Sequence, residues 1–206
     1  MSIKKAYNLW SDIYDTNENK TRDLDKIVTI EVLSKYKFDT VIELGCGTGK
    51  NTEFLASNAK EIIALDFSEK MLEKAKQKVR NNIVKFIKTD LKEDWYVEND
   101  YFDLVTCSLT LEHIKDLGDI LNQVYLKLKS GGKFFISELH PFKQYTGSKA
   151  KYESEGGINE LEVYTHHISD YLESAKRAGF NLLELNEWFD DDSKDLPRLI
   201  SFVFEK

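Results

Sequence analysis

The chain has 206 residues, of which 41% are hydrophobic and 32% are charged, and its formal net charge at pH 7 is −7. This size and balance predict one globular domain over residues 1–206, large enough to bury a core without cross-links. An acidic chain lacks the clustered positive charge that binding to nucleic acid requires. We also expect no membrane segment, because no apolar run approaches the roughly 18 residues that a span needs.

The chain contains only two cysteines and four histidines, without the spacing of a metal site, so we predict no metal. The start of the sequence has no apolar stretch typical of a signal peptide. Together with the low cysteine count, this favours a reducing, cytoplasmic location.

Short apolar runs alternate with amphipathic stretches, which is typical of a parallel sheet with crossover helices. A helix with Leu24, Ile27, Ile30 and Leu33 on one face would complete an N-terminal helical cap over residues 1–37. Other helices are expected from the Ser68 N-cap to about residue 80, near residues 120–128 before the glycines at 131 and 132, and near 170–178. The expected strands are residues 41–44, 62–65, 84–87, 102–107, 133–137, 182–188 and 199–204.

Residues 140–168 do not fit this alternation, and long insertions in compact domains are commonly functional lids. We therefore predict a substrate lid, with a plain structural insertion as the alternative. Within it, residues 160–164 alternate like a strand. Its lysines, Lys143, Lys149 and Lys151, could meet an acidic carrier, although loop lysines are usually just solvated.

A glycine-rich loop, Gly45-Cys46-Gly47-Thr48-Gly49, directly follows the first predicted strand and precedes a helix. Glycines let a backbone turn tightly and approach a ligand closely. Asp66 lies 21 residues after Gly45, at the end of the second strand, where Rossmann-like folds place an acid that binds ribose hydroxyls. Taken alone, Asp66 could equally be a turn residue before Ser68.

The loop has the spacing G-x-G-x-G, whereas the dinucleotide fingerprint is G-x-G-x-x-G. Glu43, two residues before the first glycine, is badly placed beside a pyrophosphate. It suits S-adenosylmethionine, which carries an ammonium and a sulfonium group. The loop therefore favours S-adenosylmethionine over a nicotinamide dinucleotide.

With these motifs the chain resembles the class I S-adenosylmethionine-dependent methyltransferases. Within them it is similar to the small-molecule group that includes quinone-biosynthesis C-methyltransferases and the malonyl-carrier-protein methyltransferase of biotin synthesis. The segments that carry the resemblance are residues 41–49, 66–72, 101–105, 111–114 and 128–132, with Ser130 in place of the family's usual proline.

The resemblance implies an α/β, Rossmann-like fold with a seven-stranded, mostly parallel sheet, an antiparallel last strand and helices on both faces. It implies S-adenosylmethionine as cofactor and a small-molecule methyl acceptor. In this view Phe67 would lie against adenine, Asp90 would accept from the adenine amine or only cap a helix, and Tyr14 would close the site or only pack in a groove. The implied cofactor contacts are Tyr14, Glu43, Gly45, Cys46, Gly47, Gly49, Asp66, Phe67, Met71, Asp90, Leu91, Ser108 and Leu109.

Methyl transfer from a sulfonium is an in-line displacement that can rest largely on positioning, and it needs a general base only if the acceptor enters protonated. The candidate bases are His113 after the fourth strand and His140 after the fifth, followed by Tyr145, His166 and His167. A structural role is open for each. Cys107 is interpreted as a buried strand residue.

Two other functions stay open. The chain could be a non-catalytic adaptor or sensor that binds the cofactor, because catalysis here does not require a base. It could also be a nicotinamide-dependent oxidoreductase, which the glycine spacing and Glu43 disfavour.

Overall fold

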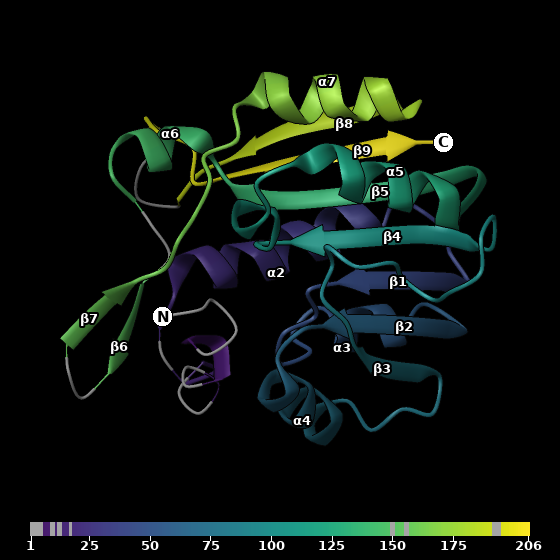
Figure 1. The fold of residues 1–206 in the computed structure, drawn as a ribbon, viewed down its shortest axis with the longest axis horizontal. Coiled ribbons are helices and arrows are strands. Elements are labelled where there is room, and N and C mark those ends of the chain that lie inside the picture. Colours follow the sequence, from purple (N-terminus) through teal and green to yellow (C-terminus); the bar gives the residue numbers. More distant parts are fainter. Residues whose placement is uncertain are drawn as a thin grey trace.

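The computed structural model describes residues 6–8, 11, 14–16, 18–148, 151–154, 157–190 and 195–206. Its centre is a seven-stranded sheet with the strand order β3-β2-β1-β4-β5-β9-β8 (Figure 1). The strands are β1 (Thr40–Leu44), β2 (Glu61–Asp66), β3 (Val84–Lys88), β4 (Phe102–Ser108), β5 (Leu128–Leu139), β8 (Asn181–Trp188) and β9 (Leu199–Glu205).

Strand direction confirms the expected topology. The pairs β1–β2, β2–β3, β1–β4 and β4–β5 are parallel. The last strand, β9, is antiparallel to both of its neighbours, β5 and β8. The order therefore reverses between β1 and β4, and in open α/β sheets such a switch point is where ligands bind.

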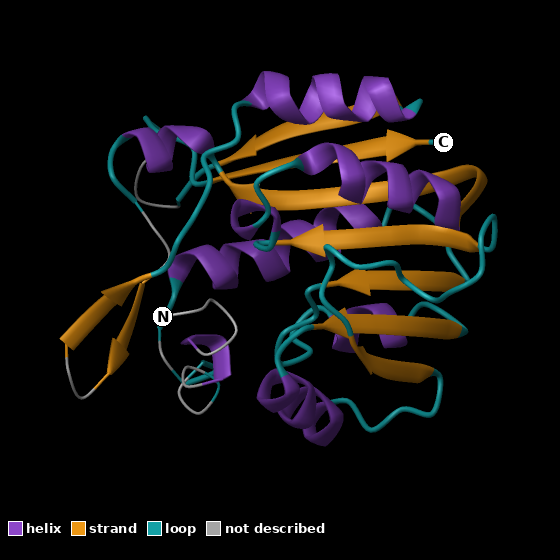
Figure 2. Ribbon diagram, in the orientation of Figure 1, coloured by secondary structure: helices purple, strands orange, loops and turns teal. Residues whose placement is uncertain are grey.

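Helices cover both faces of the sheet, as expected (Figure 2). On one face, α2 (Lys20–Leu33), α3 (Thr52–Ala56) and α4 (Glu69–Lys78) pack in a core cluster with residues such as Val41 and Phe135. On the other, α5 (Leu117–Lys127) and α7 (Ile168–Ala178) pack in a second cluster with Val105 and Phe202. Because β1 is buried along its whole length, it is apolar except at Glu43 and the hydroxyl of Thr40.

Local chemistry sets several helix ends. The Ser68 hydroxyl accepts a hydrogen bond from the Met71 amide at the start of α4, as predicted for an N-cap. Gly179 ends α7 in the left-handed conformation, with φ of 101°. The prediction that glycines 131 and 132 stop α5 was wrong, because α5 ends at Lys127 and both glycines lie within β5.

The insertion contains α6 (Pro141–Tyr145) and a separate hairpin of β6 (Lys151–Ser154) and β7 (Gly157–Glu160). Figure 1 shows this hairpin standing away from the main sheet, on the side where the N-terminal segment lies. The strand predicted at residues 160–164 was wrong, because β7 ends at Glu160 and the chain then runs on without strand pairing.

Of the cap expected over residues 1–37, the structure describes a helical stretch at residues 6–8 and the helix α2. Residues 1–5, 9–10, 12–13 and 17 lie outside the described residues, as does Lys149 of the insertion. Within the described ranges no helix combines the length and apolarity of a membrane span. The same ranges hold no group of three side chains placed to bind a metal.

Candidate cofactor site

A cavity of about 360 Å³ lies at the carboxyl ends of β1, β2 and β4. It brings together residues that are far apart in sequence and most of which follow a strand, which is the arrangement expected at a switch point. Ten of the thirteen implied cofactor contacts line it, namely Tyr14, Gly45, Gly47, Asp66, Phe67, Met71, Asp90, Leu91, Ser108 and Leu109. The candidate base His113 lines it as well.

The three glycines of the loop lie in different surroundings. Gly45 has φ of +67°, and a β-carbon there would lie 2.2 Å from the Thr110 hydroxyl oxygen. Gly47 has φ of +53° but open space around it. A β-carbon on Gly49 would meet Ala75 of α4 at 3.2 Å, and Gly49 lines neither this cavity nor the smaller one beneath it. Gly49 therefore packs closely against α4, and the cofactor contact implied for it stays a prediction.

Asp66 is fixed at the cavity by the backbone. One carboxylate oxygen accepts from the Gly47 amide at 2.9 Å, and the other accepts from the Ser68 amide at 2.7 Å. Burial nevertheless raises the pKa of Asp66 to about 6. Asp66 is thus both the turn residue before Ser68 and a carboxylate facing the cavity. These were alternatives in the sequence, and the structure combines them.

Asp90 lies at the other end of the cavity and is exposed. Its carboxylate accepts from the Lys92 amide at 3.1 Å, in a turn that no helix follows. The helix-cap interpretation is therefore wrong. Instead of a crossover helix, an irregular segment joins β3 to β4, and Trp95, 2% exposed, fills the core beneath it.

A smaller cavity of about 60 Å³ lies beneath the glycine loop and takes in Glu43 and Cys46. Glu43 accepts from the Thr52 hydroxyl at 2.5 Å. Burial raises its pKa to about 8, and the hydrogen bond from Thr52 offsets only part of that shift. The thiol of Cys46 is also buried, and its pKa lies well above the ordinary value. Cys107 is fully buried in β4, which confirms its interpretation as a strand residue.

The loop after β4 is held in a strained shape. Leu109 has φ of +51°, which residues with a side chain rarely adopt, and it lines both cavities. The next two amides, of Thr110 and Leu111, both donate to the Glu138 carboxylate at 2.8 Å. Glu138 is 1% exposed, and burial raises its pKa to about 8. This β5 residue, which the sequence analysis missed, therefore fixes the loop.

His113 faces the N-terminal segment across the cavity. Its Nδ1 lies 3.2 Å from the Glu162 carbonyl oxygen, which can only accept, so Nδ1 carries the hydrogen. Its Nε2 is then the acceptor for the Tyr7 hydroxyl at 2.7 Å. Burial lowers the pKa of His113, which keeps the ring neutral. The geometry leaves a basic nitrogen directed at a phenol in the cavity wall.

Known proteins resemble this chain in sequence and in fold. Residues 42–136 match a family model described as a methyltransferase domain. An uncharacterised protein of Haemophilus influenzae is 27% identical over 160 residues, which are 75% of this chain but only 62% of that protein. The malonyl-[acyl-carrier protein] O-methyltransferase 2 of Coxiella burnetii is 28% identical over 201 residues, which are 95% of this chain and 75% of the relative. Over the matched residues the chain is a methyltransferase domain.

Solved structures agree with the sequence matches. A Listeria monocytogenes protein, provisionally named an S-adenosylmethionine-dependent methyltransferase, gives a TM-score of 0.76 at 26% identity over 88% of this chain and 97% of its own. The N-methyltransferase NodS of Bradyrhizobium japonicum, solved with S-adenosyl-L-homocysteine, gives 0.75 at 16% identity over 98% and 97%. The second likeness concerns the fold alone. The resemblance and the fold class inferred from the motifs are confirmed.

His140 makes structural contacts at the start of α6. Its Nδ1 accepts from the Phe142 amide at 3.1 Å and caps α6, so Nε2 carries the hydrogen and donates to Glu187 at 3.0 Å. His140 lines neither cavity. His140 thus serves as a helix cap, and its candidate role as a base stays a prediction.

The remaining candidate bases of the domain lie outside both cavities. His166 is buried and donates from Nε2 to the Ile114 carbonyl at 2.7 Å, which ties the insertion to the loop after β4. His167 and Tyr145 contact each other at 2.5 Å near the surface. These side chains hold the insertion in place.

Sequence reasoning missed several residues of the cavity wall, namely Tyr7, Lys92, Thr110, Ile114 and Glu162. Tyr7 lies close in sequence to Tyr14, which was expected to close the site, so a nearby signal for it existed. The place of Glu162 depends on how the insertion folds back against His113, and nothing in the local sequence indicates that contact.

Proposed function

We propose that this protein transfers the methyl group of S-adenosylmethionine to a small molecule by in-line displacement. The observation that carries the proposal is Asp66, held by the Gly47 amide at 2.9 Å in the wall of a cavity at the β1–β4 switch point. A carboxylate there suits ribose hydroxyls. The methyltransferase-domain match and the S-adenosyl-L-homocysteine in the related fold point to the same ligand.

The residues fit an adenosyl ligand. Phe67 and Met71 offer apolar surface, and Asp90 offers a carboxylate at the far end of the same cavity. When bound, S-adenosylmethionine supplies a methyl group already activated by the sulfonium. The protein then has to orient the acceptor and exclude water, and good orientation is worth on the order of 7–11 kcal/mol.

His113 is the group we assign as general base for an acceptor that arrives with an N–H or O–H group. Its Nε2 already accepts from the Tyr7 hydroxyl, so a proton can pass from the acceptor through Tyr7 to the imidazole. Glu112 Oε1, 3.9 Å from the same nitrogen, would stabilise the imidazolium that forms. An acceptor that reacts through a carboxylate has no proton to lose and would need no general base.

The insertion supplies the wall on the acceptor side. Its returning segment is fixed to the loop after β4 by a hydrogen bond of 2.7 Å from the Tyr164 amide to the Glu112 carbonyl. Glu162 of the same segment lines the cavity. A lid role for the hairpin β6–β7 stays a prediction, tested by replacing residues 149–158 with a short Gly-Ser linker. Turnover of the acceptor should then change more than the affinity for S-adenosyl-L-homocysteine.

A cavity of about 360 Å³ favours a free metabolite, whereas the Coxiella relative is named for a carrier-bound substrate. Titration calorimetry with S-adenosylmethionine, S-adenosyl-L-homocysteine and NAD tests the cofactor directly. Micromolar binding of both adenosyl ligands without NAD binding supports the proposal. Asp66→Asn should weaken the binding of the adenosyl ligands, whereas the exposed Glu73→Gln should leave it unchanged. Binding of NAD alone would favour an oxidoreductase, and cofactor binding without turnover of any acceptor would favour a sensor.

A further inference from the structure

The smaller cavity beneath the glycine loop is lined by charges of both signs. Asp25 and Glu43 supply carboxyl groups, while Arg22 and Lys50 supply cations. Gly45, Ser108 and Leu109 line both this cavity and the main one, so the two adjoin. At about 60 Å³ it has room for roughly four groups the size of water. Its size and its paired charges match the head of an amino acid.

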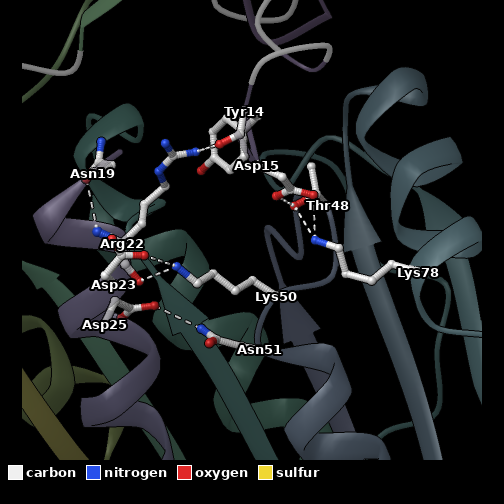
Figure 3. A network of polar contacts seen from close by, with 10 residues as sticks. All are labelled: Tyr14, Asp15, Asn19, Arg22, Asp23, Asp25, Thr48, Lys50, Asn51 and Lys78. Carbon is white, nitrogen blue, oxygen red and sulfur yellow. Dashed lines mark hydrogen bonds and ion pairs between the residues drawn. The ribbon is translucent and has the colours of Figure 1, made fainter. Parts of the chain in front are cut away.

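Asp25 has an unusual hydrogen-bonding state. It projects from α2 and is 4% exposed, and its Oδ2 accepts from the Asn51 side-chain amide at 2.9 Å. Its Oδ1 is fully buried and finds no hydrogen-bond partner among the residues that the structure describes. Figure 3 shows Asp25 and Asn51 facing each other between α2 and the loop, with Lys50 alongside. Buried carboxylate oxygens are rarely left unpaired, so this one marks the place of a missing donor.

A neighbouring atom points to the same need. Oδ1 of Asn51, which lines the same cavity, is also buried and unpaired within the described part of the chain. The Asn51 oxygen can only accept a hydrogen bond, like that of Asp25. A ligand group that donates several hydrogen bonds and carries a positive charge would satisfy this set.

We propose that Asp25 binds the α-ammonium group of the methionine moiety of the cofactor. This inference rests on the proposed function and adds a residue outside the family's motifs. The Lys50 ammonium, held by the Arg22 carbonyl at 3.0 Å and Asp23 at 2.7 Å, places a positive charge nearby for the ligand carboxylate. The cavity thus offers opposite charges to the two ends of an amino acid.

Asp25 suits this role better than Glu43. Burial raises the pKa of Glu43 to about 8, so Glu43 is mostly neutral near pH 7. Burial also raises the pKa of Asp25, but the Ser137 hydroxyl, the Asn51 amide, the Ser108 hydroxyl and the Lys50 charge oppose part of that shift. A bound ammonium would favour the charged form further.

The test pairs two variants with three ligands in titration calorimetry. The ligands are S-adenosyl-L-homocysteine, its decarboxylated analogue, which keeps the ammonium, and its deaminated analogue, which keeps the carboxylate. The variants are Asp25→Asn and, as the matched control on an exposed position of α2, Glu31→Gln. Asp25→Asn should weaken the two ammonium-bearing ligands by about 10- to 100-fold and the deaminated one by less than about threefold. The control should weaken none.

Equal losses for all three ligands, or no loss for any, would overturn the inference and leave Asp25 with structural or water contacts only. A second measurement uses the unaltered protein. The carboxyl carbon of Asp25, followed by NMR, should titrate at lower pH with S-adenosyl-L-homocysteine than with the deaminated analogue, and an identical titration would contradict the proposal. If the unaltered protein binds none of the three ligands, the proposed function itself fails.

Discussion

The hydroxyl of Tyr7 lies 2.7 Å from Nε2 of His113, across 106 positions of sequence. This contact joins the N-terminal segment to the loop after β4, directly over the cavity. The Tyr7 ring also packs edge-on against Phe67 at 5.8 Å, so one side chain contacts both the base candidate and the residue expected to lie against adenine. The pair closes the cavity and supplies a path for a proton.

The first prediction concerns this pair. His113→Asn should lower kcat by about 10²- to 10⁴-fold for an acceptor that must lose a proton, because proton removal is worth about that much. Tyr7→Phe should lower kcat in the same direction by less. Initial rates of S-adenosyl-L-homocysteine release measure both effects, with affinity for the cofactor product as the control. A full rate in His113→Asn would show that positioning alone suffices.

A second prediction separates two glycines of the loop. Gly45→Ala should destabilise the fold by about 2–5 kcal/mol, because φ is +67° and the new methyl would overlap the Thr110 side chain. Gly47→Ala, in open space, should cost only about 1–2 kcal/mol of backbone strain. Chemical denaturation measures both costs. Thr110→Ala should rescue part of the Gly45 loss and none of the Gly47 loss, and equal costs at both positions would contradict the steric argument.

Much of the fold could be predicted from local patterns. The strand before Gly45 and the Ser68 cap are set by neighbours within a few residues, and both form as expected. The contacts of His140 and Gly49 could not be predicted, because they are made with distant partners, Glu187 and Ala75. A glycine pattern shows where a backbone turns, but not which side chain packs above it.

The same limit applies to the site. Asp66 was predictable because strand two must end beside the loop. Asp25 carried no sequence signal, since an acid on an amphipathic helix normally faces water, and only the packing of α2 over the glycine loop buries it. Buried polar groups of this kind become visible when the elements are placed in space.

A third prediction concerns stability and pH. Burial raises the pKa of Glu43 from 4.5 to about 8, so the folded state holds this proton more tightly than the unfolded chain. The free energy of unfolding should therefore fall as pH rises from about 4.5 to about 8 and level off above. Glu138, also raised to about 8, and Glu112, to about 7, act in the same direction.

Glu43→Gln isolates one part of this slope, because glutamine keeps an acceptor for the Thr52 hydroxyl without a titrating group. The difference in the free energy of unfolding between the variant and the unaltered protein should shift in favour of the variant, by on the order of a few kcal/mol, between pH 5 and pH 8. Urea denaturation across this range measures the difference. The exposed Glu73→Gln should leave the slope unchanged, and a slope in Glu43→Gln as steep as that of the unaltered protein would show that Glu43 is charged in the fold.

The last prediction concerns how the N-terminal segment is fastened. Asp15 accepts from the Thr48 hydroxyl of the glycine loop at 2.6 Å and pairs with Lys78 of α4 at 2.6 Å (Figure 3). Burial alone would raise the pKa of Asp15, yet its hydrogen bonds to Lys78 and Thr48 make the net shift downward. These contacts and the Tyr7–His113 contact hold residues 6–8 and 14–16 over the cavity from two sides. A bound adenosyl ligand would leave only when the segment lifts.

Lys78→Met should therefore raise the dissociation rate of S-adenosyl-L-homocysteine by about 3- to 10-fold, the effect of losing a partly exposed ion pair with its hydrogen bonds. Stopped-flow displacement measures the rate. High salt should speed release from the unaltered protein, because salt screens the Asp15–Lys78 ion pair. It should have little further effect on the variant, which lacks this ion pair. Lys70→Met, at an exposed position of the same helix, is the matched control. If Lys78→Met releases the ligand at the unaltered rate, the segment does not limit release.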